Sequence, residues 1–206
     1  MNFILSFATL SEKLTVKIGE WSSFLVLPLI AVIMYDVLTR KFAFVQQAVQ
    51  RSFLYDYMSP TKLQELEWHI HAAFFLLAFG YGYFKNAHVR VDILRDQMQA
   101  KRKAVIELAG LVLLALPYTF LMLLFGWEFV VNSYHQGEGS SALTGVPNRW
   151  IIKSTLLIGF AFLLISVLAT ALRLAVVLAM GTDRSNAILS EMSIISSEPV
   201  QKDLTL

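Results

Sequence analysis

The chain has 206 residues, of which 56% are hydrophobic and 16% are charged, and its formal net charge is +2. Soluble domains carry roughly 25% charged residues, so this composition favours a protein that lies in a lipid bilayer. The small and scattered positive charge argues against a nucleic-acid surface. The absence of cysteine excludes disulfides, thiolate metal sites and cysteine nucleophiles.

Residues 1–181 are expected to form a single all-α transmembrane domain. A membrane-crossing helix needs about 20 mostly apolar residues. Four stretches reach that length: residues 21–39, 66–84, 105–131 and 151–180. Two segments, at about 3–14 and 42–57, carry hydrophobic residues at steps of three and four, which predicts amphipathic helices at the membrane interface, on the chain's own helices or against a partner. Residues 182–206 show no periodicity and are expected to form a loose cytoplasmic tail.

The distribution of basic residues predicts the orientation of these spans. Eleven of the 17 lysine and arginine residues fall in the N-terminal segment, the 85–104 loop and the C-terminal tail, which share one side of a four-span protein. By the positive-inside rule that side is cytoplasmic, so both termini are expected inside.

Few ionisable residues lie within the predicted spans. Asp36 and Arg40 are four residues apart, which predicts an ion pair along one helix face. Glu67 and His71 have the same spacing, with Trp68 on a neighbouring stripe. Two interpretations of Glu67 remain open: a contact with another subunit, or simple stabilisation of a negative charge near the start of a helix.

Histidines raise one alternative function. His69 or His71, together with His135, are expected on the same side of the bundle, as the two axial ligands of a haem would be. The chain would then be a haem-binding subunit for electron transfer in the membrane. The sequence contains no nucleotide-binding, zinc-protease or hydrolase motif, so we expect no enzyme activity, no cofactor and no metal site.

Two connecting segments carry the most specific patterns. The run from Lys85 to Leu94 alternates polar and apolar residues and contains three candidate structural residues, His88, Arg90 and Asp92. A later segment contains a second set: Glu138, Ser140, Gly145, Pro147, Trp150 and Lys153. Glycine and proline in that segment predict a turn that enters the last span.

These patterns resemble the small membrane subunit, of the DctQ type, of tripartite ATP-independent periplasmic (TRAP) transporters. In that family a tryptophan-led second span is followed by a His-Val/Ile-Arg-Val-Asp loop, to which the run from Trp68 to Leu94 is similar. The family's E-x-S…G-x-P…W-x-x-K pattern resembles residues 138–153. The resemblance covers about residues 21–177 and is closest to the branch labelled mannitol/chloroaromatic or α-keto-acid.

The resemblance implies a non-catalytic subunit of a sodium-driven importer of small organic acids in the bacterial inner membrane. Its implied partners are the large DctM-type membrane subunit, a periplasmic substrate-binding protein and membrane lipids, with no nucleic acid. The subunit would scaffold the large one and help to dock the binding protein. Residues for these contacts or for local structure would be the following: Glu67, Trp68, His88, Arg90, Asp92, Glu138, Ser140, Pro147, Trp150 and Lys153.

Overall fold

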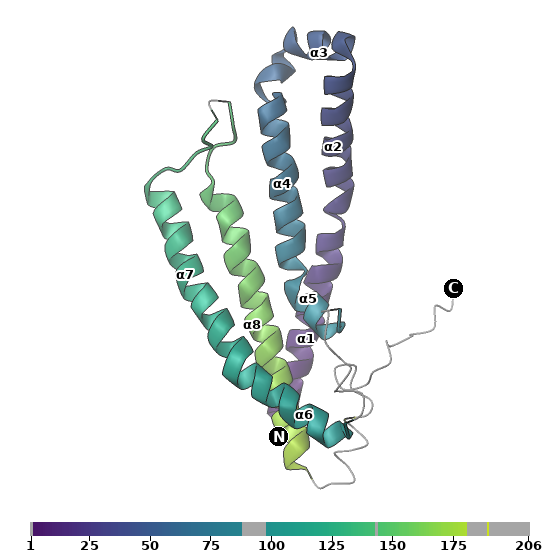
Figure 1. Ribbon diagram of the computed structural model, residues 1–206, viewed down its shortest axis with the longest axis vertical. Helices are drawn as coiled ribbons and strands as arrows, with labels where there is room; N and C mark the ends of the chain where they lie inside the picture. Colours follow the sequence, from purple (N-terminus) through teal and green to yellow (C-terminus); the bar gives the residue numbers. More distant parts are fainter. Residues whose placement is uncertain (1, 88–97, 143, 181–188, 190–206) are drawn as a thin grey trace, which may run out of the picture. The chain divides into compact units, whose positions relative to one another are not determined.

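The computed structural model describes residues 2–87, 98–142, 144–180 and 189, and within them every regular element is a helix. The predicted all-α fold class is therefore confirmed. In chain order the elements drawn in Figure 1 are α1 (Asn2–Ser23), α2 (Val26–Lys41), α3 (Ala43–Gln50), η1 (Phe53–Asp56), α4 (Pro60–Leu77), α5 (Phe79–Phe84), α6 (Ala100–Gly110), η2 (Leu111–Ala115), α7 (Leu116–His135) and α8 (Trp150–Ala179).

Among the described residues, three helical runs are long and apolar enough to cross a membrane. They are Leu5–Lys41, Ala100–His135 and Trp150–Ala179. Many of their large apolar side chains are exposed, as expected where lipid rather than protein surrounds a helix. The chain is thus an integral membrane protein.

The span predicted at residues 66–84 falls on two helices, α4 and α5, which a turn at Ala78 separates. It is not one of the three long apolar runs, because α4 carries charged residues in its first turns. A fourth span therefore stays a prediction, as does the single domain expected over residues 1–181. The predicted tail lies outside the described residues, apart from Leu189.

The chain forms two compact units, which are described separately. The first comprises residues 1–19, 79–121 and 161–206, and its buried core is apolar. Here α1 packs through small residues, since a Cβ on Gly19 would overlap Tyr81 and one on Gly80 would overlap Thr15. An ion pair at 2.8 Å joins Arg173 of α8 to Glu12 of α1.

The amphipathic pattern predicted at residues 3–14 lies in the first half of α1. Its small and polar face, with Ala8 and Ser11, is buried in the first unit. Its large apolar side chains, Leu10 and Leu14, are exposed. This arrangement is the reverse of a water-soluble amphipathic helix and suits a helix that faces lipid with its apolar side.

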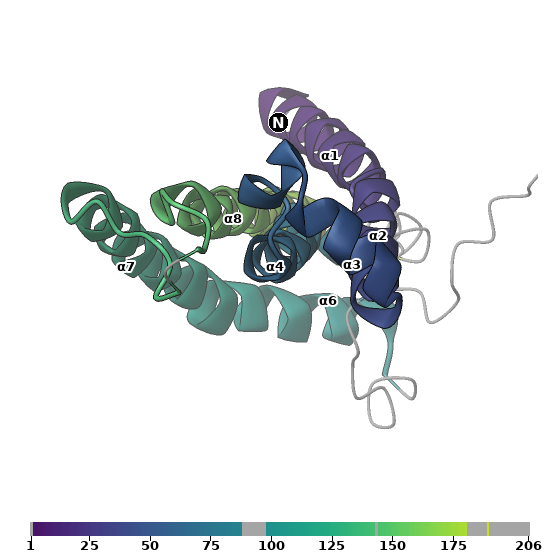
Figure 2. The ribbon, with the colours of Figure 1, turned by 90° about the horizontal axis from the view of Figure 1, so that it is seen from above.

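The second unit comprises residues 20–78 and 122–160. Its helices α2 and α4 run side by side in opposite directions, and α3 and η1 connect their ends (Figures 1 and 2). The α8 helix approaches another face of α4, because a Cβ on Gly159 would lie 2.5 Å from the carbonyl oxygen of Leu76. Helix α4 therefore has protein on two faces, and its first turns reach the loop between α7 and α8.

Candidate functional site

Glu65, in the second turn of α4, is the centre of a polar cluster that joins α4 to the α7–α8 loop (residues 136–149). The residue is buried, with 9% of its surface exposed. Its carboxylate accepts hydrogen bonds from the Ser140 hydroxyl and from the backbone N–H of Val146. The Arg149 guanidinium lies 3.5 Å from the same carboxylate. One side chain thus holds three positions of a loop that is far away in sequence.

The surroundings of Glu65 keep it ionised. Burial on its own raises the pKa of this carboxyl, because it disfavours the charged form. The hydrogen bonds from Ser140 and Val146 and the positive charge of Arg149 outweigh that effect and lower the pKa below its ordinary value. The negative charge is therefore part of what holds the loop.

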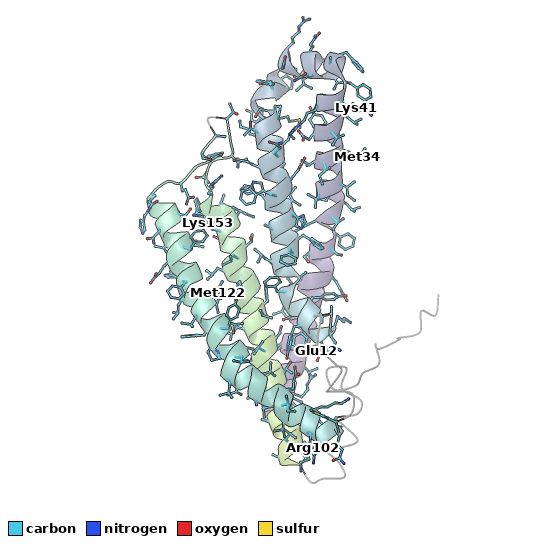
Figure 3. The ribbon with its side chains drawn as sticks, viewed as in Figure 1. Glu12, Met34, Lys41, Arg102, Met122 and Lys153 are labelled. Carbon is cyan, nitrogen blue, oxygen red and sulfur yellow. The ribbon has the colours of Figure 1, made fainter. Side chains whose placement is uncertain are left out.

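A second bridge closes the loop on itself. Lys153, in the first turn of α8, donates to the Glu138 carboxylate and lies 3.8 Å from the centre of the Phe129 ring on α7. Figure 3 shows Lys153 at the end of α8 that meets the loop. The hydrogen bond from Lys153 lowers the pKa of Glu138 below its ordinary value. The backbone N–H of Arg149 donates to the Glu138 carbonyl at 2.9 Å.

The backbone of the loop needs its glycine and asparagine residues. Gly137 and Asn148 have φ values of 58° and 60°, a conformation that most side chains disfavour. Gly145 lies so close to Ser140 and Glu65 that a Cβ would overlap both side chains. The loop is therefore fixed by its backbone as well as by its charges.

The remaining residues of the predicted motif shape the end of the loop. Pro147 is exposed next to the hydrogen-bonded Val146. Trp150 begins α8 and packs edge-on against Tyr134 of α7, with ring centres 5.5 Å apart at 89°. Pro147 and Trp150 therefore lie where the chain passes from the loop into α8.

Asp36 and Arg40 form an ion pair within α2, with a shortest distance of 2.6 Å. When the Gln64 amide of α4 takes the orientation that satisfies both groups, its oxygen accepts from the Arg40 guanidinium at 2.8 and 2.9 Å. The ion pair thus links two successive turns of α2, and through Gln64 it also links α2 to α4.

Glu67 and Trp68 lie away from the loop, in a groove between α2 and α4 that His71 also lines. His69 is placed differently, because its Nδ1 contacts the backbone carbonyl of Glu65. His135 lies at the end of α7, beside the Tyr134 ring.

The structure therefore gathers Glu138 and Ser140 in the α7–α8 loop (the braced loop), with Lys153 of α8 bonded to it, and leaves Glu67 and Trp68 on a separate surface. The candidates His88, Arg90 and Asp92 lie outside the described residues. Glu65 and Arg149 were not among the site residues predicted from the sequence. The spacing of residues along a helix could not indicate the role of Glu65, because its loop partners are 75 and 81 residues away in the sequence.

Comparison with known proteins gives one match. The sequence model of the family described as "Tripartite ATP-independent periplasmic transporters, DctQ component" matches residues 29–177. No significant match was found among curated proteins or solved structures. The family match does not distinguish between branches, and it gives no support to the haem alternative. Because the match covers well over half of the chain, from α2 to the end of α8, the chain belongs to the DctQ family and is the small membrane component of a TRAP transporter.

Proposed function

We propose that this chain is the non-catalytic small permease subunit of a sodium-coupled TRAP transporter that imports small organic acids across the bacterial inner membrane. It scaffolds the large DctM-type subunit and helps to dock the periplasmic substrate-binding protein. Four spans cross the membrane, the fourth being residues 66–84, and both termini lie in the cytoplasm. Membership of the DctQ family over residues 29–177 is the observation that carries this proposal.

The scaffold role is supported by the character of the spans. Their exposed side chains are mostly large and apolar, which suits contact with lipid or with another membrane protein. The sequence has no internal repeat of the kind from which complete secondary transporters are built. A second, larger subunit is therefore the expected site of transport.

The docking role is supported by the α7–α8 loop. By the positive-inside rule this loop faces the periplasm. Two charged bridges tie its described residues to the helices, one to Glu65 of α4 and one from Glu138 to Lys153 of α8. A surface that is rigid before binding loses less conformational entropy when a partner docks. The exposed loop residues around Pro147 and Thr144 are the proposed contact.

The experiment is co-expression of the tagged chain with the large subunit and the binding protein, followed by purification and reconstitution in liposomes. We expect a complex of the two membrane subunits, and uptake of an organic acid that requires both a sodium gradient and the binding protein. A potassium gradient is the control. Purification of the chain alone, from cells in which the large subunit transports without it, would contradict the proposal.

A separate variant tests the docking role. Thr144→Arg places a bulky charge on the exposed loop without touching Glu65, so the membrane complex should form normally. Uptake should then need a higher concentration of binding protein for half its maximal rate. The same concentration dependence as wild type would remove the loop from the docking surface.

A further inference from the structure

An open groove runs between α2 and α4, apart from the braced loop. Helix α4 provides one stripe of its wall, on successive helical turns: Gln64, then Glu67 and Trp68, then His71, then Phe75. Helix α2 provides the apolar side chains of Leu29 and Ile33. The groove has a volume of about 470 Å³, and within a membrane such a space is filled by neighbouring side chains or lipid rather than left empty.

Glu67 makes this groove unusual. Its Oε1 atom is buried, and among the described residues it has no hydrogen-bond partner. A carboxylate is a pure acceptor, so only a donor, and best a cation, satisfies that oxygen once the carboxylate turns toward the groove that Glu67 lines. Ionisable groups at membrane depth face a partner or a cavity, since exposure to hydrocarbon is costly.

The spacing of the polar residues identifies the kind of partner. Gln64, Glu67 and His71 place one polar group on each successive turn of α4. At a rise of about 1.5 Å per residue they extend over about 10 Å of depth. A phospholipid headgroup presents its charges at one depth, with apolar chains below. A second helix presents side chains turn by turn, and therefore matches this stripe better than a lipid does.

We propose that the α2/α4 groove receives a transmembrane helix of the large subunit, and that this helix presents a lysine or arginine side chain to Glu67. The inference rests on the proposed function, whose large subunit supplies the helix. Trp68 and Phe75, which are 44% and 55% exposed, form the apolar border of the contact. The braced loop takes no part in it.

The first test is photocrosslinking in the reconstituted complex, with benzoylphenylalanine in place of Phe75. Phe120 of α7 is a matched control, because it is the same residue type and is 56% exposed, against 55% for Phe75. We expect the Phe75 position to crosslink to the large subunit with a yield about tenfold above that of the Phe120 position, a difference easily resolved on gels. Adducts with phospholipid alone, or equal yields at the two positions, would overturn the proposal.

The second test changes the charge without changing the shape. Glu67→Gln should weaken binding of the large subunit about tenfold, the effect of losing one charge-assisted hydrogen bond. Glu128→Gln removes an exposed carboxylate from α7 and should leave binding unchanged. Equal affinities for Glu67→Gln and wild type would refute the cationic partner.

The outcomes separate this inference from the proposed function. If the wild-type chain binds the large subunit and supports uptake while the Phe75 position gives no protein crosslink, the groove assignment alone is wrong. If the wild-type chain forms no complex, the proposed function is wrong and the groove assignment is wrong with it.

Discussion

Replacing Glu65 with alanine should release the α7–α8 loop from α4. The substitution removes the acceptor of the Ser140 hydroxyl and of the Val146 N–H, and the counter-charge of Arg149 at 3.5 Å. Alanine is the best helix former, so α4 itself is not weakened. The effect should therefore be confined to the loop and the first turns of α4.

The loss of loop stability in the Glu65→Ala variant can be worked out from the contacts that are lost. A hydrogen bond to a charged group contributes about 1.5–3 kcal/mol, and removing one partner of a buried ion pair costs about 3–5 kcal/mol. Ser140 remains bonded to the Ala142 N–H after the substitution, which reduces the loss. We expect the free energy of local opening to fall by about 3 kcal/mol, which corresponds to about 100-fold faster amide exchange.

Hydrogen exchange of the detergent-solubilised protein, read by mass spectrometry at the peptide containing Val146, measures this change. Glu67→Ala is the matched control, because it removes a carboxylate two residues away that faces the α2/α4 groove. It should leave exchange of the loop unchanged. Wild-type protection at Val146 in the Glu65→Ala variant would show that this carboxylate does not hold the loop.

Two further predictions concern pH and helix packing. The pKa values of Glu65 and Glu138 are both lowered from the ordinary 4.5, so the folded loop binds fewer protons than the unfolded one; its stabilisation is full above 4.5 and is lost as the pH falls through the lowered values. Loop protection factors, corrected for intrinsic exchange, should drop over that acid range, and constant protection would refute the role of these charges. Gly159→Ala should lower the thermal unfolding midpoint, because the new Cβ overlaps the Leu76 carbonyl, whereas Gly110→Ala meets no atom within 4 Å and should raise the midpoint slightly. Shifts of the same sign in both variants would contradict the packing of α4 against α8.

Apolar length was enough to predict helices where the chain continues without interruption. The stretch predicted at 151–180 is α8, Trp150–Ala179, and the stretch at 105–131 lies within Ala100–His135. The stretch at 21–39 instead crosses the turn at Phe24 and Leu25 between α1 and α2. Pro28 has no N–H to donate to the carbonyl four residues earlier, which explains a break at that place.

Only part of the candidate site could be predicted from the sequence. Glu138 and Lys153 are 15 residues apart at the two ends of one loop, so their pairing follows from a local turn. Glu65 meets Ser140 across 75 residues of chain, and no periodic pattern carries that information. Among neighbouring acidic residues of α4, packing alone decides that Glu65 faces the loop and Glu67 the groove.

The separation between Glu65 and its loop partners also constrains biogenesis. The ribosome releases α4 long before it has made Ser140, Val146 and Arg149. Until α7 and α8 have been inserted, the nascent protein carries a carboxylate beside apolar helices with none of these three partners. The contact between α4 and the α7–α8 loop therefore forms only after the last hairpin has entered the membrane, and that hairpin completes the assembly.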